Sequence, residues 1–154
     1  MSTNKDHLLL HHLRHNSRTT LTRLSKKTGI PVSTIFDKIR GNLNNLIKKN
    51  TSLINYEALG YHARIQALLK IRREDRENAR DYFSKHIAIN NAYRINNGYH
   101  YIIEAILKDL PAVEQFLEEL EKNVNIEDKK VFYIIENIKV EAIFTQGETT
   151  LKRF

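Results

Sequence analysis

The chain of 154 residues contains no cysteine and no long apolar run. Without cysteine there are no disulfides and no thiolate chemistry, which suits a reducing cytosol. The apolar cluster near the N-terminus is only three leucines long, residues 8–10, and is flanked by histidine and charge. We therefore expect neither a signal peptide nor a membrane span, and we place the protein in the cytoplasm.

Motifs of enzymes are also scarce. No nucleophile with a neighbouring base, no glycine-rich phosphate loop and no paired-carboxylate motif stands out from the sequence. We therefore expect no enzymatic activity, no catalytic residues and no cofactor.

Positive charge is what the chain has in excess, and it is unevenly distributed. Residues 1–60 contain ten Lys or Arg against three Asp or Glu, a net +7, whereas residues 61–154 contain fifteen of each sign. A basic part joined to a neutral part indicates a polyanion as partner of the first part only. The alternative is that surface Lys and Arg merely keep the protein soluble.

Residues 20–46 have the pattern of a helix-turn-helix. Leu21 and Leu24 face inward on the first helix, and Gly29 permits a left-handed turn that a side chain would oppose. The apolar stripe of the second helix consists of Ile35, Ile39, Leu43 and Leu46. A preceding helix over residues 6–14, with Leu9, Leu10 and Leu13 on one face, is expected to pack behind this pair.

The outward face of this motif supplies candidate DNA contacts. With Ile35 and Ile39 inward, helical periodicity turns polar side chains outward and leaves Phe36 at the margin of the buried face. Small side chains allow the helix to enter a major groove, and basic side chains suit contacts to phosphate or guanine. The N-terminus of the first helix of the motif favours a bound anion such as phosphate. The candidates are Arg18, Thr20, Ser33, Thr34, Asp37, Lys38, Arg40 and Asn44. An ordinary polar surface is the alternative.

Histidines recur on the helix predicted over residues 6–14. His7, His11 and His15 have the spacing i, i+4, i+8, which can chelate a divalent metal. Because no cysteine or carboxylate converges on them by sequence to complete a site, we interpret them as a solvated polar face and expect no bound metal.

From residue 61 onward the apolar period changes from 3.6 to 2. The sequence predicts strands over 61–73, 87–95, 99–107 and 131–144, with helices over 74–85 and from Pro111. Asn97 and Gly98 mark a type I′ hairpin, since both tolerate a positive φ. The order β-α-β-β-α-β is that of a ferredoxin-like sandwich with both helices on one face of the sheet.

The uncovered face of this sheet indicates self-association. Its expected apolar residues are Leu68, Ala88, Ala92, Ile102, Ile106 and residues 131–135. Burial against a second copy of the chain is the simplest way to cover them. We divide the chain into a helix-turn-helix domain (1–50), a connector (51–60), a ferredoxin-like domain (61–145) and a polar tail (146–154).

These residues resemble a known family. The order Asp6, Leu9, Leu10, Leu13, Asn16, Arg18, Leu21, then Gly29-Ile30, Ser33-Thr34-Ile35 and Ile39, resembles the N-terminal half of the Lrp/AsnC (feast/famine) transcription regulators. The βαββαβ half resembles their effector-sensing and oligomerising domain. The resemblance implies an α+β protein with an N-terminal (winged) helix-turn-helix domain and a C-terminal ferredoxin-like (RAM/ACT-like) domain.

The function that the resemblance implies is sequence-specific regulation of transcription. Family members form dimers that assemble into octamers or similar rings, bind pseudo-palindromic double-stranded DNA and sense amino acids. By resemblance, Arg18 and Thr20 contact phosphate, Ser33 and Thr34 approach base edges, and Lys38 takes the place of a basic residue usual in the third helix.

Two departures from the family pattern affect these expectations. Pro31 stands where many relatives have a capping Ser, so the start of the recognition helix is expected to shift by up to two residues. The effector loop aligns with Asn97, Gly98, Tyr99 and His100, where relatives have an acidic residue and an Asp. His100 replaces a carboxylate, so a different ligand, a pH-dependent one or none would each fit.

Two other functions remain open from the sequence. One is an architectural protein of the nucleoid that wraps duplex DNA. The other is an enzyme that decarboxylates a sirohaem-type tetrapyrrole, since such enzymes resemble this family and His62, His86 and His100 are available to contact substrate carboxylates.

Overall fold

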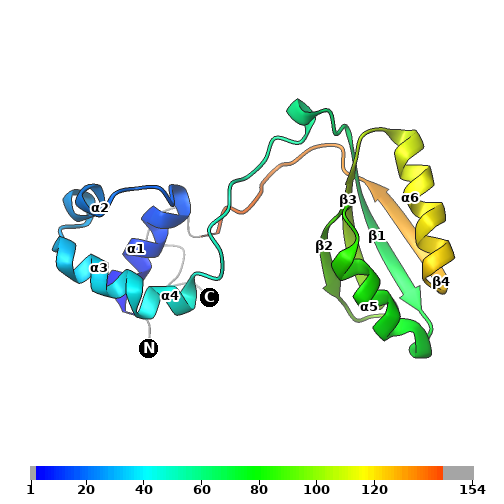
Figure 1. Ribbon diagram of the computed structural model, residues 1–154, viewed down its shortest axis with the longest axis horizontal. Helices are drawn as coiled ribbons and strands as arrows, with labels where there is room; N and C mark the ends of the chain where they lie inside the picture. The colour runs from blue at the N-terminus through cyan, green and yellow to red at the C-terminus, as the bar shows by residue number, and fades with distance from the viewer. Residues whose placement is uncertain (1–2, 144–154) are drawn as a thin grey trace. The chain divides into compact units, whose positions relative to one another are not determined.

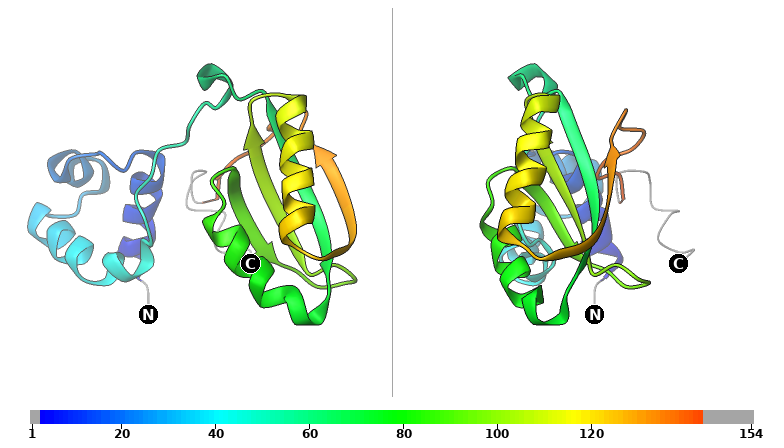
Figure 2. Two further views of the ribbon diagram at one scale, coloured as in Figure 1. Left: turned by 45° about the vertical axis from the view of Figure 1, so that its right-hand side comes forward. Right: turned by 90° about the vertical axis from the view of Figure 1, so that its right-hand side faces the viewer.

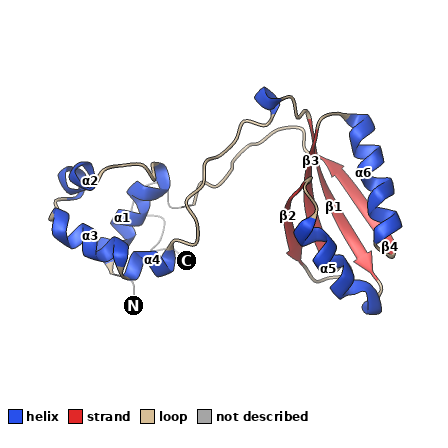
Figure 3. Ribbon diagram, in the orientation of Figure 1, coloured by secondary structure: helices blue, strands red, loops and turns tan. Residues whose placement is uncertain are grey.

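The computed structural model describes residues 3–143 and divides the chain into two compact units (Figure 1). The first contains the described residues up to 53 together with 138–143, and the second contains residues 54–137. The first unit is helical and the second is built on a β-sheet (Figure 3). The tail predicted over residues 146–154 lies outside the described residues.

Four helices form the first unit: α1 (Asn4–His15), α2 (Leu21–Thr28), α3 (Val32–Arg40) and α4 (Asn42–Leu46). Their buried core contains Leu9, Leu24, Ile30, Ile35 and Leu43. The inward placement of these leucines and of Ile35 confirms the helical periodicity read from the sequence. The described part of this unit, residues 3–53 and 138–143, contains no strand and therefore no β wing.

Local signals set the ends of these helices. Thr20 accepts a hydrogen bond from the Arg23 amide and caps α2. Gly29 ends α2 with φ of 69°, a left-handed conformation that disfavours any residue with a Cβ. Pro31 directly precedes α3 and makes no side-chain capping hydrogen bond. The predicted second helix was too long, because it breaks at Gly41, and Leu46 is 47% exposed instead of buried.

The second unit follows the predicted βαββαβ order. Its strands are β1 (Ala63–Ile71), β2 (Ile89–Arg94), β3 (Tyr101–Leu107) and β4 (Ile126–Tyr133), and its helices are α5 (Arg76–Lys85) and α6 (Leu110–Asn123). Two short 3₁₀ turns, η1 (Glu57–Leu59) and η2 (Arg73–Asp75), flank β1. The antiparallel sheet has the order β2-β3-β1-β4. Helices α5 and α6 cover the same face of the sheet (Figure 2).

Side-chain alternation places the core on that helix-covered face. Alternate residues of β1 from Ala63 to Ile71 are buried, together with their partners on β3. Apolar residues of the two helices close this core, among them Ala79, Phe83, Val113, Phe116 and Leu120. Asn97 and Gly98 have φ of 67° and 93°, which confirms the predicted turn between β2 and β3.

The prediction was wrong about the last strand and part of the uncovered face. Strand β4 spans 126–133, not 131–144, because the chain joins the sheet directly after α6 and β4 pairs with β1 at the sheet edge. An edge strand tolerates the charges of residues 127–130, which hid it from a hydrophobicity pattern. Ala88 and Val131 pack against the helix-side core, and Ala92 pairs with Ile103 of that face.

Candidate DNA-binding surface and effector hairpin

Helix α3 exposes one face, and most of the predicted DNA contacts lie on or near it. Ser33, Asp37 and Arg40 are exposed on α3, while Thr34 is half-buried. Asn44 is exposed on α4. Arg18 and Thr20 are exposed immediately before α2. The α3 set and the α2 N-terminus therefore belong to one helix-turn-helix unit whose polar side chains are accessible to solvent.

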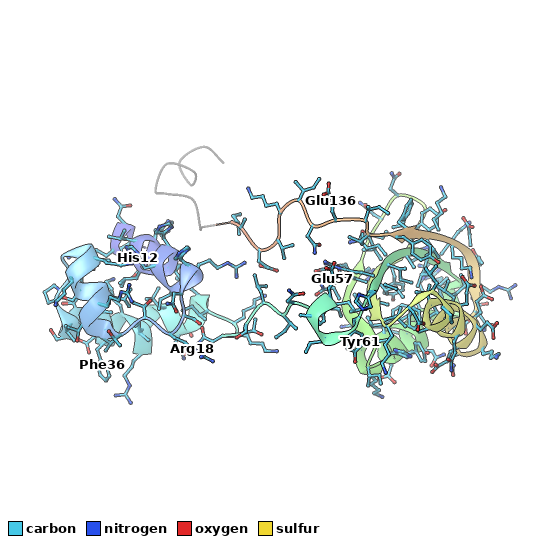
Figure 4. All side chains as sticks on the ribbon, turned by 90° about the horizontal axis from the view of Figure 1, so that it is seen from above. His12, Arg18, Phe36, Glu57, Tyr61 and Glu136 are labelled. Carbon is cyan, nitrogen blue, oxygen red and sulfur yellow. The ribbon has the colours of Figure 1, made fainter. Side chains whose placement is uncertain are left out.

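Phe36 belongs to this exposed face and not to the margin of the core. Its side chain is 45% exposed, and Val32, one turn earlier, is 42% exposed. The Arg40 guanidinium, one turn later, lies over the Phe36 ring at 5.0 Å from the centroid. In Figure 4, Phe36 lies on the opposite side of the helical unit from His12 of α1. The i, i+4, i+8 spacing of Val32, Phe36 and Arg40 was the sequence signal for this row.

Lys38 has a different orientation from the one predicted. Its ammonium donates to Asp6 Oδ1 at 2.7 Å and to Thr3 Oγ1 at 3.2 Å, and its side chain is only 18% exposed. Asp6 is fully buried and also accepts from the Thr3 amide at 2.7 Å. The prediction of an outward Lys38 was wrong, because a buried carboxylate on α1 needs a counter-ion and Lys38 provides it.

The Lys38 ion pair explains the acidity of Asp6. The hydrogen bond from Lys38, followed by the bond from the Thr3 backbone, lowers the Asp6 pKa from 3.8 to about 2. Asp6 therefore remains charged at neutral pH and ties the start of α1 to the middle of α3. Sequence reasoning placed Asp6 near a helix start but could not find its partner, because the two residues lie 32 positions apart.

Helix α2 extends the basic character of this unit. Arg23, Lys26 and Lys27 are exposed on α2, in addition to Arg18 before it and Arg40 on α3. One histidine of α1, His12, lies close to this basic surface. The pKa of His12 is lowered first by burial and then by the positive charges of Lys27 and the neighbouring histidines. Within residues 3–143, no group of three or more His, Cys, Asp or Glu is arranged to hold a metal ion.

The predicted effector residues of the β2–β3 hairpin point to different neighbours. Asn97 and Gly98 are exposed at the turn. The Tyr99 hydroxyl donates to Asp128 Oδ2 at 2.7 Å, and Lys130 lies over its ring. The Asp128 hydrogen bond raises the pKa of Tyr99. His100 Nδ1 accepts from the Ile71 amide at 2.9 Å, and Nε2 lies 2.6 Å from an Arg76 nitrogen.

His100 is therefore half-buried against Ile71 and Arg76 and is not presented at the turn. Burial, followed by the charge of Arg76, lowers its pKa, so the ring is neutral at pH 7. Both neighbours of the ring, an amide and a guanidinium, are hydrogen-bond donors, whereas a neutral imidazole offers one acceptor. A carboxylate at this position could accept from both donors, whereas the neutral imidazole accepts from one.

An open hollow lies beside this hairpin at the start of β4. Its lining carries both signs of charge, with carboxylates at Glu121, Glu127 and Asp128 and cations at Arg72 and Lys129. Asp128 also receives the Tyr99 hydroxyl, which links the hollow to the hairpin. Such a lining offers partners to both the ammonium and the carboxylate of a zwitterion.

The open face of the sheet combines apolar side chains with one buried ion pair. Register places Leu68, Ile102, Ile106, Tyr93 and Phe132 on this face. Glu104, on the same face, accepts from Arg64 at 2.6 Å and from Asn90 at 2.7 Å. Burial opposes the charge of Glu104, but these hydrogen bonds outweigh it and lower its pKa. Arg64 Nε is buried with no acceptor among residues 3–143.

The histidines proposed for a tetrapyrrole site have separate surroundings. His86 packs edge-on against Phe116, at 5.1 Å between ring centroids, while His100 contacts Ile71 and Arg76. His62 is exposed at the start of β1.

No helix within residues 3–143 is long and apolar enough to cross a membrane.

A helix-turn-helix unit joined to a four-stranded ferredoxin-like unit is the architecture of a class of transcriptional regulators. The family model of the Lrp/AsnC ligand binding domain matches residues 65–143, about half of the chain. An HTH-type transcriptional regulator of Pyrococcus furiosus is 30% identical over 146 residues, covering 87% of this chain and 91% of the relative. The regulator FL11 of Pyrococcus horikoshii is 28% identical over 107 residues, 69% of this chain and 71% of the relative.

Solved structures show the same fold. AsnC of E. coli matches with a TM-score of 0.83 at 18% identity, covering 94% of this chain and 99% of that chain. A Neisseria meningitidis transcriptional regulator in complex with L-Met matches with a TM-score of 0.84 at 17% identity, covering 91% and 94%. The chain belongs to the Lrp/AsnC family of transcriptional regulators. The resemblance and the α+β fold class inferred from the sequence are thereby confirmed.

Proposed function

We propose that this protein binds specific operator DNA as a homodimer or a larger ring of dimers, and regulates transcription by occupying that DNA in the cytoplasm. The observation that carries the proposal is the exposed face of α3, which presents Ser33, Asp37 and Arg40 within residues 1–60, the part of the chain with a net charge of +7. Hydroxyl, carboxylate and guanidinium groups at one helix face suit the donor and acceptor pattern of a major groove.

The proposed DNA contacts fall into two groups. Phosphate contacts come from Arg18 and from the capped N-terminus of α2 at Thr20, where free amides and the helix dipole favour an anion. Base-edge contacts come from α3, with Asn44 on α4 beside it: Ser33, Thr34, Asp37, Arg40 and Asn44. Lys38 is removed from this set, because its ammonium neutralises Asp6 inside the unit.

Self-association through the open sheet face supports specific binding. One α3 helix offers few groups able to read bases, so a single copy is expected to bind weakly. Two copies place two such helices in successive major grooves. The open face exposes the rings of Tyr93 and Phe132, which a second chain would bury. A second chain could also supply a hydrogen-bond acceptor for Arg64 Nε, which has none among residues 3–143. An octamer or similar ring is the family's way to extend this pairing.

An amino-acid-like effector is proposed to act at the hollow beside the hairpin. Arg72 and Lys129 can receive a carboxylate there, and Glu127 and Asp128 can receive an ammonium. The N. meningitidis structural relative is described with L-Met, which supports this class of ligand. Calorimetric titration with the twenty amino acids tests it: binding of at least one supports the proposal, and no heat with any of them contradicts it.

The DNA-binding proposal is tested by the ratio of two affinities. Duplexes selected from a random library with the full chain are compared with scrambled duplexes by fluorescence anisotropy. The expected preference is on the order of 10³-fold, with binding that weakens steeply as salt rises. Arg40→Ala should reduce that preference, whereas Arg80→Ala, an exposed arginine of α5, should leave it unchanged. Equal affinity for both duplexes would contradict sequence-specific regulation and favour an architectural DNA-binding protein.

A further inference from the structure

The exposed face of α3 is partly apolar, which the polar contacts proposed above do not explain. Val32 and Phe36 are 42% and 45% exposed, one turn apart. The core of the unit is filled by Leu24, Ile35 and Leu43 from the other side of these helices. Phe36 is therefore not a core residue at the margin of its cluster, and its ring is available to a partner that approaches α3.

Charge identifies the kind of partner that suits this apolar pair. Val32 and Phe36 are bordered by Ser33 and Asp37 on α3, and Arg40 stacks on the Phe36 ring. Exposed Arg23, Lys26 and Lys27 lie on the adjoining helix α2. A small apolar row within a basic surface fits a polyanion that carries small apolar groups. The major groove of DNA has one such group, the C5-methyl of thymine.

We propose that Phe36, with Val32 beside it, contacts thymine methyl groups, so that each half-site of the operator contains thymine opposite this row. This inference rests on the proposed DNA-binding function and adds a source of specificity to it. The stacked Arg40 guanidinium is pre-positioned by the Phe36 ring, next to the base that Phe36 contacts. Apolar contact would then select thymine, and the polar neighbours on α3 would select adjacent bases.

Uracil substitution tests the contact directly, because deoxyuridine differs from thymidine only by the missing methyl. Duplexes selected with the full chain are resynthesised with deoxyuridine at one thymine position at a time. For the wild-type protein we expect about a fourfold loss of affinity at one or two positions per half-site, the factor for one buried methyl group. At the remaining positions the substitution should change nothing.

Variants of the row connect that loss to Phe36. Phe36→Ala should bind the thymine duplex more weakly and no longer distinguish it from the uracil duplex. Phe36→Leu, which keeps an apolar side chain, should retain part of the difference. Leu46→Ala is the matched control, because Leu46 is 47% exposed on α4 outside the row, and it should keep the full wild-type difference. The circular dichroism of each variant verifies that the helices are intact.

The outcomes separate this inference from the function on which it rests. If no library duplex is enriched, the DNA-binding proposal itself fails. If duplexes are enriched but every thymine can be replaced without loss, DNA binding stands and the thymine contact is wrong. A Phe36→Ala protein that keeps the wild-type uracil penalty overturns it as well. A Phe36→Ala protein that binds DNA normally but loses self-association also overturns the inference, since Val32 and Phe36 would then contact a second chain.

Discussion

Replacing Asp6 by asparagine removes one negative charge from the interior of the helical unit while nearly preserving the shape of the side chain. Asp6 is fully buried, and its pKa is lowered from 3.8 to about 2, chiefly by the hydrogen bond from Lys38. A difference of this size corresponds to roughly 2.5 kcal/mol of stabilisation of the charged form at neutral pH. Asparagine resembles the protonated acid, so Asp6→Asn should lose about this amount.

Amide hydrogen exchange measures this loss within the intact chain. Exchange at Leu24 and Ile35 reports the opening of the helical unit, and at pH 6 it should be about 60-fold faster in Asp6→Asn than in the wild type. Ile65 and Ile103, buried in the sheet unit, serve as the internal reference and should not change. Because the chain is divided into two compact units, a residue-specific probe is used in place of a single melting curve.

The direction of the pH dependence follows from the lowered pKa. A carboxyl group that is more acidic when folded contributes its full stability above its unfolded pKa, and loses it as the pH falls toward the folded pKa. The stability difference between wild type and Asp6→Asn should therefore be constant above about pH 4 and should close as the pH approaches 2. Asp37→Asn, an exposed carboxylate on α3, is the control. Equal exchange in wild type and Asp6→Asn at pH 6 would refute the structural role given to the ion pair.

Three further predictions follow from single residues. Gly29→Ala should destabilise the helical unit by about 1 kcal/mol, because φ of 69° disfavours a Cβ; unchanged Leu24 exchange would contradict this. Glu104→Gln should destabilise the sheet unit by roughly 1–3 kcal/mol at pH 7, while exposed Glu114→Gln should not. Amide hydrogen exchange at Ile65 and Ile103 measures both variants, and equal effects would argue against the Arg64 pairing. The ring protons of His100 should titrate in NMR with a midpoint below 6.5, so the neutral ring stabilises the sheet unit above that pH and this stability is lost as the pH falls. A midpoint at or above 6.5 would be inconsistent with its half-buried position beside Arg76.

Features with a local cause were predictable from the sequence. Gly29 and the Asn97-Gly98 turn each depend on the backbone preference of one or two residues, and both were confirmed. The alternation along β1 and the amphipathic spacing of α6 likewise follow from burial on one side only. The charge difference between the two parts of the chain needed only counting.

Features that depend on a distant partner were not predictable. Nothing near Lys38 in sequence reveals the buried carboxylate of Asp6, and nothing near His100 reveals Arg76. Strand β4 was misplaced because its charged residues are tolerated only at an edge, and the strand order that makes it an edge is a property of the whole sheet. Helical periodicity, with Ile35 and Ile39 inward, placed Phe36 at the margin of the buried face, whereas its side chain is 45% exposed.

The most direct test of the central claim is a hydroxyl-radical footprint of the full chain on a selected duplex. Two copies that present their α3 helices to successive major grooves should protect two short segments on one face of the DNA, about 10 base pairs apart or a multiple of that. Arg40→Ala should weaken both protections together, since both come from the same residue of paired chains. A single uniform protection that is the same on any DNA sequence would contradict specific binding by a paired helix-turn-helix.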